Sequence, residues 1–286
     1  MVDLHLIHQI QLGILANVAA INSKYHLEYF LTGGSAIGAV RHHVFIPWDD
    51  DIDIGLPRTD FEKFLQVAPA ELLHRGYFVE ENRLDPQYEY DFAKVMADGT
   101  RILEHGRELT KAKNGIFIDV FPFDRMPNKR TQQHNQQAKL AMLLEEIRKR
   151  FYPDLYQQSI TQSKYADYNL NELYDIRLST MTQYNGHSEL SLINMSSPYQ
   201  YGKELIKPTE IHHLIPMDFE NLQVPVLADY DAYLTRLYGD YMKLPPLNKR
   251  IQRHVLKVQV DNFTKRTLKL NPAIIWNKPL VNCSRN

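Results

Sequence analysis

Cysteine is almost absent from this chain of 286 residues, since Cys283 is the only one. A single cysteine excludes an internal disulfide framework and a cysteine-based zinc site, and it fits a reducing compartment. Long apolar runs are also missing: polar residues such as Asp3, His8 and Asn22 interrupt the first 27 residues. That stretch resembles neither a cleavable signal peptide nor a run of about 18 apolar residues, so we expect a cytoplasmic protein.

A strong excess of charge of either sign is lacking as well. Lys and Arg number 33 against 34 Asp and Glu, for a net charge of −1. This balance argues against a broad nucleic-acid surface and against a polybasic membrane patch. Apolar residues make up 44% of the chain, which suffices for a core, and the length suits one large domain or a core with a smaller annex.

Apolar periodicity predicts a mixed α+β fold. The expected helices span 4–23, 36–41, 59–68 (opened by a capping box of Thr59 and Glu62), 132–151 and 229–238. The expected strands span 29–31, 50–55, 77–79, 91–96, 100–102, 116–121 and 219–226, the last as a strand or a hairpin, with a turn at Asp98-Gly99 between two of them.

The patterning divides the chain into three parts. Residues 1–126 are predicted to form the catalytic core. Residues 127–215 are predicted to form a helical insertion, with poor patterning from 151 to 201, that serves as an acceptor region. Residues 216–286 form a C-terminal extension that completes the site, and Leu244-Pro245-Pro246 breaks the chain sharply within it.

What the sequence does contain is a cluster of four carboxylates, Asp49, Asp50, Asp51 and Asp53, between large apolar residues. A solvated acidic loop is not usually bracketed in this way. Buried carboxylates repel one another and lose hydration, so they need a compensating cation. Oxygen ligands favour Mg²⁺ or Mn²⁺ over zinc.

Strand parity separates these carboxylates. Successive side chains of a strand alternate between faces, so Asp51 and Asp53 share one face, Asp49 has the same parity, and Asp50 points the other way. Asp119 is the lone charge in the apolar run 116–123 and is the expected third carboxylate, on a neighbouring strand. The alternative for Asp119 is a buried carboxylate satisfied by a backbone or arginine partner.

Gly33-Gly34-Ser35 lies between a predicted strand and a predicted helix. Glycines let a phosphate approach the backbone, and a helix N-terminus favours an anion. Alone this tripeptide is most often a turn. Together with the downstream Asp-x-Asp it predicts a metal site beside a phosphate cradle, which is the apparatus of phosphoryl or nucleotidyl transfer.

Seven further residues are candidates for substrate contacts. Arg41 lies one short helix after the glycines and is a candidate for a donor phosphate, with an ordinary surface arginine as the alternative. Lys94 is a candidate for the negative donor, Trp48 for stacking on cytosine or a choline cation, and Asp124 for the acceptor; packing or solvated positions are their alternatives. Asp240, Tyr241 and His254 belong to a C-terminal polar cluster that is expected to close over the site.

These motifs resemble the signature of the LicD family. The matching segments are Thr32 to His43, Phe45 to Ile54, Pro57-Arg58-x-Asp60-Phe61, Ile118 to Asp124 and Tyr238 to Pro246. The resemblance implies a nucleotidyltransferase-like (polymerase-beta-like) fold with a mixed sheet and flanking helices. By position, Asp51 and Asp53 match the metal-binding Asp-x-Asp, Asp49 falls in the same block, and Asp119 matches a later Asp as third ligand or base.

The resemblance also implies an activity, the transfer of a phospho-alcohol from a CDP-alcohol to a glycan hydroxyl. Phosphocholine from CDP-choline onto a bacterial lipopolysaccharide, teichoic acid or capsule is the expected case. Other CDP-alcohols (ribitol, glycerol), nucleotidyl transfer to a sugar and a non-enzymatic CDP- or glycan-binding protein are the alternatives. The implied partners are a CDP-alcohol and a glycan or lipid-linked oligosaccharide, without nucleic acid, for a cytoplasmic enzyme that works alone or in peripheral association with the inner face of the membrane.

Overall fold

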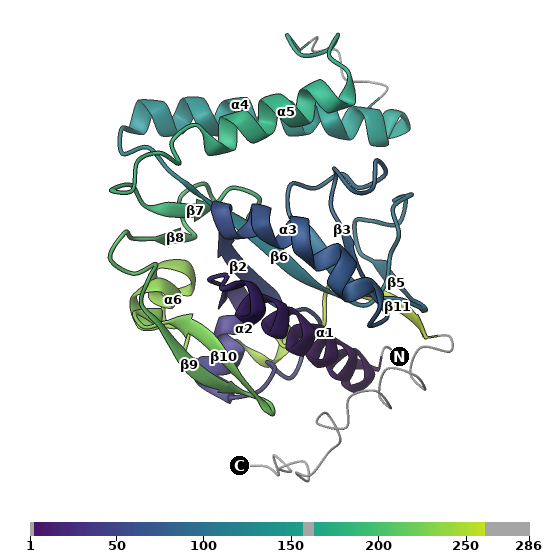
Figure 1. Ribbon diagram of the computed structural model, residues 1–286, viewed down its shortest axis with the longest axis vertical. Coiled ribbons are helices and arrows are strands. Elements are labelled where there is room, and N and C mark those ends of the chain that lie inside the picture. Colours follow the sequence, from purple (N-terminus) through teal and green to yellow (C-terminus); the bar gives the residue numbers. More distant parts are fainter. Residues whose placement is uncertain (1–2, 157–162, 261–286) are drawn as a thin grey trace.

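The computed structural model describes residues 3–156 and 163–260, so Cys283 lies outside the described residues (Figure 1). The helices are α1 (Leu4–Tyr25), α2 (Gly33–Ile37) continued by a π-helix (Gly38–His42), α3 (Arg58–Leu73), α4 (Arg130–Phe151), α5 (Leu170–Thr182) and α6 (Tyr230–Tyr238). Short 3₁₀ turns occupy Pro153–Tyr156 and Leu247–Lys249. The strands are β1 (Phe30–Leu31), β2 (Asp53–Pro57), β3 (Tyr77–Glu80), β4 (Ala93–Ala97), β5 (Thr100–Glu104), β6 (Phe117–Arg125), β7 (Leu192–Asn194), β8 (Leu205–Ile206), β9 (Leu214–Phe219), β10 (Leu222–Leu227) and β11 (Val255–Val260).

A mixed sheet forms the centre of the molecule. Its strands run in the order β1-β2-β6-β4-β3, and β7 pairs with the far end of β6 and with β8. The β2–β6 pair is parallel, whereas the other pairs among the described residues of this sheet are antiparallel. The central strand is β6, as its continuous apolar pattern predicts, and both of its neighbours contribute to the site described below.

Helices α1 and α3 pack together against the sheet, and both contact β6 (Figure 1). The isoleucines of α1, at positions 7, 10, 14 and 21, are at most 4% exposed, so this amphipathic helix has its apolar face in the core as predicted. By length and mean hydropathy alone α1 is also apolar enough to cross a membrane. Its four isoleucines contribute to that hydropathy and are buried in the core.

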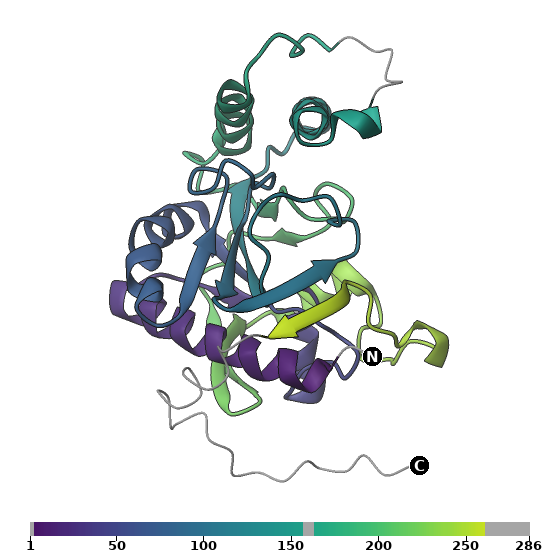
Figure 2. The ribbon, with the colours of Figure 1, turned by 90° about the vertical axis from the view of Figure 1, so that its right-hand side faces the viewer.

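Helices α4 and α5 form a separate layer, at the top of both overall views (Figures 1 and 2). They pack on each other through a small apolar cluster of Leu143, Ile147, Tyr165 and Leu173 that is distinct from the main core. We call this pair the annex. Arg177 joins it to the core, because its Nε lies 2.5 Å from Asp91 Oδ2.

Several element predictions need correction. The strand predicted at 50–55 begins only at Asp53, because residues 49 and 50 are held by side chains of α1 and not by a neighbouring strand. The Thr59–Glu62 capping box does not form: α3 begins at Arg58, and Glu62 instead pairs with Arg58 at 3.1 Å. The same helix continues past Ala68 to Leu73, since buried Leu72 anchors its last turn in the core.

Two further differences concern pairing and the weakly patterned region. The chain reverses at Asp98-Gly99, but β5 pairs with β11 from the C-terminal region and not with β4. The stretch 151–201, predicted as helical, also supplies β7, which joins the main sheet through β6. Both pairings bring together residues far apart in the chain, and local sequence patterns carry no signal for such contacts.

Candidate active site

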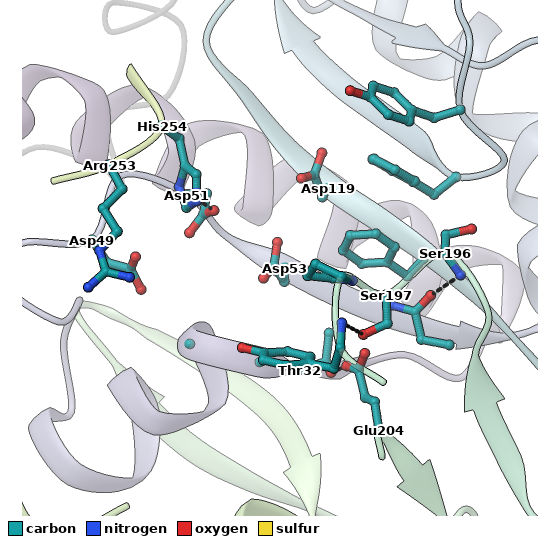
Figure 3. Close-up of a pocket in the computed structure, with 18 of the residues that line it drawn as sticks. Thr32, Asp49, Asp51, Asp53, Asp119, Ser196, Ser197, Glu204, Arg253 and His254 are labelled. Carbon is teal, nitrogen blue, oxygen red and sulfur yellow. Dashed lines mark hydrogen bonds and ion pairs between the residues drawn. The ribbon is translucent and has the colours of Figure 1, made fainter. Parts of the chain in front are cut away.

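A cavity of about 740 Å³ lies between the sheet, the annex and the C-terminal segment. The side chains of β6 alternate, so Phe117, Asp119 and Phe121 line the cavity while Ile118 and Val120 are fully buried on the other side. Asp49, Asp51 and Asp53 line it from the preceding loop and β2 (Figure 3). The predicted carboxylates therefore converge on one cavity.

Register across the sheet aligns four ionisable residues in one row. Glu80 on β3 is opposite Lys94 on β4, Lys94 is opposite Asp119 on β6, and Asp119 is opposite Asp53 on β2. Lys94 Nζ lies 3.1 Å from Asp119 Oδ1 and 3.1 Å from Glu104 Oε1. Lys94 is therefore committed to carboxylates of the protein.

Two polar residues on α1 shape the acidic loop. His8 Nε2 lies 2.7 Å from the backbone oxygen of Asp49, and Gln11 Nε2 donates to the backbone oxygen of Asp50 at 2.8 Å. Gln11 also donates to Phe117 O at 3.1 Å, which ties the loop to β6. These contacts fix the backbone of residues 49 and 50 and leave the side chain of Asp49 in the cavity.

The two glycines allow the carboxylates to lie against the start of α2. A β-carbon on Gly34 would stand 2.6 Å from Asp49 Oδ2, and one on Gly33 would stand 3.0 Å from Asp53 Oδ2. Gly33 has a φ of +58°, a conformation that side chains disfavour. Contrary to the prediction, the glycines are the first residues of the helix and do not precede it. Ser35 lies outside the cavity lining and its Oγ accepts a hydrogen bond of 2.8 Å from Asp53 N.

Electrostatics in this cluster are unfavourable without a cation. Burial, together with the charge of Asp51, raises the pKa of Asp49 to about 8, and burial raises the pKa of Asp53 well above its usual range. Burial likewise raises the pKa of Asp119 to about 6, although Lys94 lowers it in part. Asp119 Oδ1 is buried and has no partner in hydrogen-bond geometry, so its contact with Lys94 is an ion pair only.

These observations fit a divalent cation. Asp49, Asp53 and Asp119, whose pKa values are raised, form together with Asp51 the oxygen-only donor set that Mg²⁺ and Mn²⁺ prefer. The β-carbons missing at Gly33 and Gly34 are what lets two of them lie side by side.

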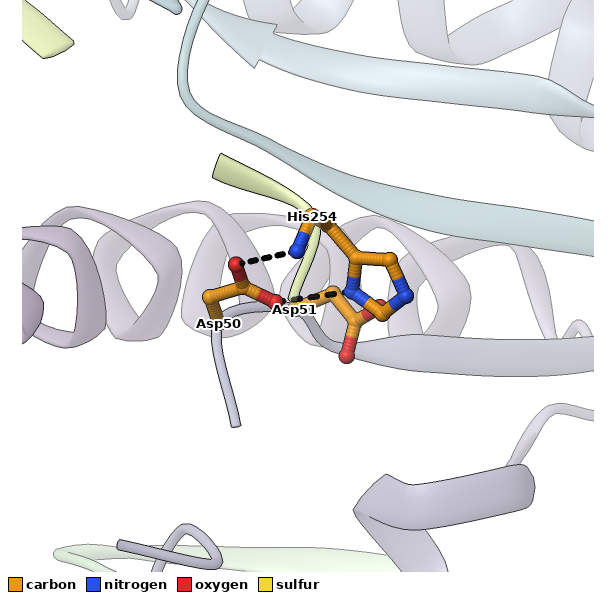
Figure 4. A group of neighbouring side chains, drawn as sticks. All are labelled: Asp50, Asp51 and His254. Carbon is orange, nitrogen blue, oxygen red and sulfur yellow. Dashed lines mark hydrogen bonds and ion pairs between the residues drawn. The ribbon is translucent and has the colours of Figure 1, made fainter. Parts of the chain in front are cut away.

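A second group of possible ligands, Asp50, Asp51 and His254, is an ion-pair cluster (Figure 4). Asp50 Oδ1 lies 2.8 Å from His254 Nδ1, and its Oδ2 accepts from Gln252 Nε2 and from the backbone N–H groups of His254 and Val255 at 2.6, 3.0 and 2.8 Å. Both oxygens of Asp50 are therefore used. Hydrogen bonds to Asp50 and Asp51 raise the pKa of His254 to about 11, which favours the imidazolium form and its ion pairs with both carboxylates.

The remaining predicted residues divide into two groups. Gly33, Gly34, Trp48, Lys94 and His254 line the cavity, whereas Ser35, Arg41, Asp124, Asp240 and Tyr241 do not. Asp124 is fully buried and its carboxylate pairs with Arg58 at 2.6 Å, so it stabilises the end of β6 and does not reach a substrate.

Arg41 and Tyr241 contact each other instead of the cavity. The Arg41 guanidinium donates to the backbone oxygen of Tyr241, and the Tyr241 hydroxyl donates to Asp231 at 2.9 Å. Asp240 is exposed beside them. Trp48 is half-buried, with the Arg250 guanidinium 5.6 Å from its ring centre.

Sequence reasoning missed a polar network in the wall of the cavity, where Thr32, Glu204, Tyr199 and Tyr238 are lining residues. Glu204 accepts a hydrogen bond from Thr32 Oγ1 at 2.5 Å and from the Tyr233 hydroxyl at 3.0 Å. Burial raises the pKa of Glu204. Tyr199 and Tyr238 add a pair of hydroxyls joined at 2.8 Å. Glu204 precedes a strand of two residues, which is too short to give a periodic signal.

Comparison with known proteins places these motifs in context. A family model described as LicD/FKTN/FKRP, nucleotidyltransferase domain, matches residues 26–169. The lipopolysaccharide cholinephosphotransferase LicD of Haemophilus influenzae is 30% identical over 263 residues, which is 87% of this chain and 95% of that protein. The human ribitol 5-phosphate transferase FKRP is 31% identical over 99 residues, covering 34% of this chain and 17% of that protein. The match to the Haemophilus protein therefore covers more of the chain than the residues that the family model matches.

Proposed function

The chain belongs to the LicD family and is a phosphotransferase of that type, and we propose that it transfers phosphocholine from CDP-choline to a hydroxyl of a bacterial cell-surface glycan. The acceptor would be lipopolysaccharide, teichoic acid or capsule, and CMP would be the second product. The observation that carries this proposal is the convergence of Asp49, Asp51, Asp53 and Asp119 in one cavity.

The proposed reaction follows from the charges of the site. The acceptor oxygen forms a bond to the alcohol-side phosphorus of the donor, the bond from that phosphorus to the bridging oxygen breaks, and CMP leaves with the bond electrons. Asp119, with a pKa of about 6, is a carboxylate at neutral pH and is proposed to take the hydroxyl proton. Lys94 would hold Asp119 in place through the 3.1 Å ion pair.

Asp51 and Asp53, with Asp49, are proposed to hold Mg²⁺ or Mn²⁺, and Asp119 is the fourth ligand in the alternative in which it does not act as the base. When bound, such an ion supplies Lewis-acid stabilisation of the charge that develops on the diphosphate. The protein's own part is to set the ligands: β2 and β6 place Asp53 and Asp119 in register, and Gly33 and Gly34 leave room for Asp49 and Asp53. We propose that this pair of parallel strands is the catalytic unit of a polymerase-beta-like nucleotidyltransferase fold.

The domain division is proposed on the same grounds. Residues 1–126 would form the catalytic core, 127–215 the insertion that includes the annex, and 216–286 the extension that completes the site. The acceptor is proposed to enter beside the annex, since Leu144, Arg148 and Arg177 line the cavity from that side.

Peripheral association with the inner face of the membrane is supported by the C-terminal segment. Residues 241–260 contain five Lys and Arg and no Asp or Glu, and five of their apolar side chains are at least 43% exposed: Met242, Leu244, Leu247, Ile251 and Leu256. Apolar groups among cations suit an anionic lipid surface. Flotation with vesicles containing phosphatidylglycerol tests this, and Leu247→Ser should reduce the bound fraction if the segment makes the contact.

One labelling experiment separates the candidate reactions. The enzyme is incubated with Mg²⁺, a glycan acceptor and CDP-choline labelled in both cytidine and choline. Labelled choline on the glycan with free CMP supports the proposal, whereas cytidine label on the glycan indicates nucleotidyl transfer. Parallel reactions with CDP-ribitol and CDP-glycerol, scored by CMP release, identify the alcohol. Binding of CDP-choline without turnover in any of them would favour a binding protein.

A further inference from the structure

Several Lys and Arg side chains that line the cavity have no role in the reaction proposed above. Six Lys and Arg side chains line it, and three of them are committed to carboxylates: Lys94 to Asp119 and Glu104, Arg107 to Glu104, and Arg177 to Asp91. The other three are Arg148, Lys249 and Arg253. Among the described residues, none of these three has a carboxylate within ion-pair distance.

Lys249 and Arg253 come from the same piece of chain, residues 245–255, which we call the C-terminal strap. Pro245, Ile251 and His254 of the strap also line the cavity. His254 Nδ1 lies 3.2 Å from Asp51 Oδ2, so the strap reaches the proposed metal ligands directly. In Figure 3, Arg253 and His254 lie on the side of the cavity occupied by Asp49 and Asp51. Arg148 belongs to α4 and enters from the annex.

Asp50 holds the strap in this position. Four donors of the strap, two side chains and two backbone N–H groups, bind its two oxygens at 2.6 to 3.0 Å. Asp50 is 1% exposed, and these hydrogen bonds lower its pKa against the effect of burial. A buried carboxylate with every acceptor position directed at one segment is a strong anchor, because leaving it unpaired is costly. Figure 4 shows the contact of Asp50 with His254.

We propose that Lys249 and Arg253 bind the diphosphate of the donor nucleotide and that Asp50 is the positioning residue that keeps them beside the metal ligands. This inference rests on the proposed function, because it assumes a nucleoside-diphosphate donor. Among the described residues Lys249 and Arg253 have no carboxylate partner, and Arg253 donates only to the backbone oxygen of Lys249, at 3.5 Å. Next to carboxylates that would hold a metal ion, these two cations would place positive charge on a second side of the diphosphate. Lys94, the residue expected from the sequence to meet the donor, is excluded because its ammonium group is occupied by Asp119 and Glu104.

Binding of CDP tests the cation pair without requiring turnover. Calorimetric titration with CDP in the presence of Mg²⁺ is compared for the wild type, Lys249→Ala and Arg253→Ala. Each variant should lose roughly tenfold in affinity, the magnitude of one charge-assisted hydrogen bond. Cytidine, followed by ligand-observed NMR, should bind wild type and variants alike because it carries no phosphate.

Matched controls locate the effect. Lys257→Ala on β11 and Arg101→Ala on β5 remove exposed cations that do not line the cavity, and both should bind CDP like the wild type. Arg148→Ala, on the annex side, removes the third cation that has no carboxylate partner in the described part of the chain, and it should leave CDP affinity unchanged. Loss of CDP affinity in Arg148→Ala together with wild-type affinity in Lys249→Ala and Arg253→Ala would overturn the proposal.

The positioning role of Asp50 needs a readout that a general loss of stability does not produce. Asp50→Asn should increase hydrogen exchange within residues 245–255 and lower CDP affinity to that of the Lys249→Ala, Arg253→Ala double variant. Gln252→Ala removes one of the four donors while keeping Asp50, and should give a smaller change in both measurements. Faster exchange in the strap with unchanged CDP affinity in either variant would show that the strap does not bind the diphosphate.

Separate measurements test the phospho-alcohol transfer and the binding of the diphosphate by Lys249 and Arg253. Wild-type protein that binds CDP but releases no CMP from any CDP-alcohol contradicts the proposed function and leaves the cation pair supported by the binding data. Wild-type protein that transfers the phospho-alcohol while Lys249→Ala and Arg253→Ala keep the wild-type KM for the donor contradicts the cation pair alone. Absence of CDP binding by the wild type contradicts both.

Discussion

At the scale of single residues, the acidic stretch separates into side chains with opposite roles. Asp49, Asp51 and Asp53 line the cavity, while Asp50 is turned away from it and binds the C-terminal strap. Alternation of side chains predicts this division, although residues 49–52 lie before the start of β2. In this stretch His8 and Gln11 bind the backbone oxygens of Asp49 and Asp50, and the backbone oxygen of Ile52 accepts a hydrogen bond from Asp119 N at 2.8 Å.

Asp53→Asn should abolish most of the activity, because it removes one proposed metal ligand and its charge. We expect kcat/KM to fall by about 100-fold or more. Mutation of residues that only support metal ligands already lowers metal affinity or activity by roughly 10- to 100-fold. The rise in Tm on adding Mg²⁺ should disappear as well. Asp98→Asn, in the exposed turn, is the control and should match the wild type. Full activity in Asp53→Asn would rule out a metal site at this position.

Glu80, which is not one of the proposed metal ligands, predicts how the stability of the protein depends on pH. Burial and a hydrogen bond to Asp85 raise its pKa from 4.5 to about 8, so the folded protein keeps a proton that the unfolded chain releases. The contribution of this group to stability is therefore complete below about pH 4.5 and is lost as pH rises to 8. Glu80→Gln should match the wild type at pH 5 and be more stable than it at pH 9, by urea denaturation.

The control for Glu80 is Glu145→Gln, whose side chain is 48% exposed and whose partner Lys149 stays protonated from pH 5 to 9. Its stability relative to the wild type should stay constant from pH 5 to 9. A constant difference for Glu80→Gln over the same range would show that Glu80 is ionised in the folded protein.

At the scale of elements, the start of α2 is the part of the site most sensitive to a single methyl group. Gly34→Ala would place a β-carbon 2.6 Å from Asp49 Oδ2, so the carboxylate must move. We expect a loss of about tenfold or more in Mg²⁺ affinity, measured by the Mg²⁺ dependence of Tm, with a stable fold. Gly186→Ala meets no atom within 4 Å and serves as the control. Equal Mg²⁺ affinity in both variants would show that the absence of a side chain at Gly34 is not required for metal binding.

For helix α2 the sequence predicted a short helix beside the glycines, but it did not predict that the glycines themselves begin the helix. Thr32 is its N-cap by position, but its hydroxyl binds Glu204 and Tyr233 and not a backbone N–H of the helix. The glycines consequently begin the helix under the carboxylates. Neither Glu204 nor Tyr233 is near Thr32 in sequence, so local capping rules do not include them.

At the scale of the whole molecule, the annex has an apolar cluster of its own and should respond to mutation independently of the core. Leu173 is fully buried within that cluster, and Leu173→Ala should cost about 2–5 kcal/mol locally. We expect faster hydrogen exchange in α4 and α5 with unchanged CDP affinity, and a higher KM for the glycan acceptor. Leu155→Ala, 67% exposed, is the control. Loss of protection throughout the sheet would show that annex and core unfold as one unit.

How far the sequence predicts this molecule depends on the range of the contacts concerned. The core strand β6, helix α1 and the metal carboxylates follow from periodicity, parity and composition, because these depend on neighbours a few residues away. Arg41 and Asp124 were expected at the substrate and are instead bound to Tyr241 and Arg58. Asp124 and its partner are 66 residues apart in the chain, and Arg41 and its partner are 200 residues apart. A local sequence pattern carries no information about contacts over such distances.

The sequence by itself determined the family, the mixed α+β class and the residues Asp49, Asp51, Asp53 and Asp119. Only the tertiary structure decided which cations are available to a substrate: Lys94 is taken by Asp119 and Glu104, while Lys249 and Arg253 are brought to the cavity by the strap. The physical reason is that a motif specifies chemistry through the order of its residues. Whether a charge is paired, in contrast, depends on which distant segment folds against it, as Asp50 and the strap do over about 200 residues.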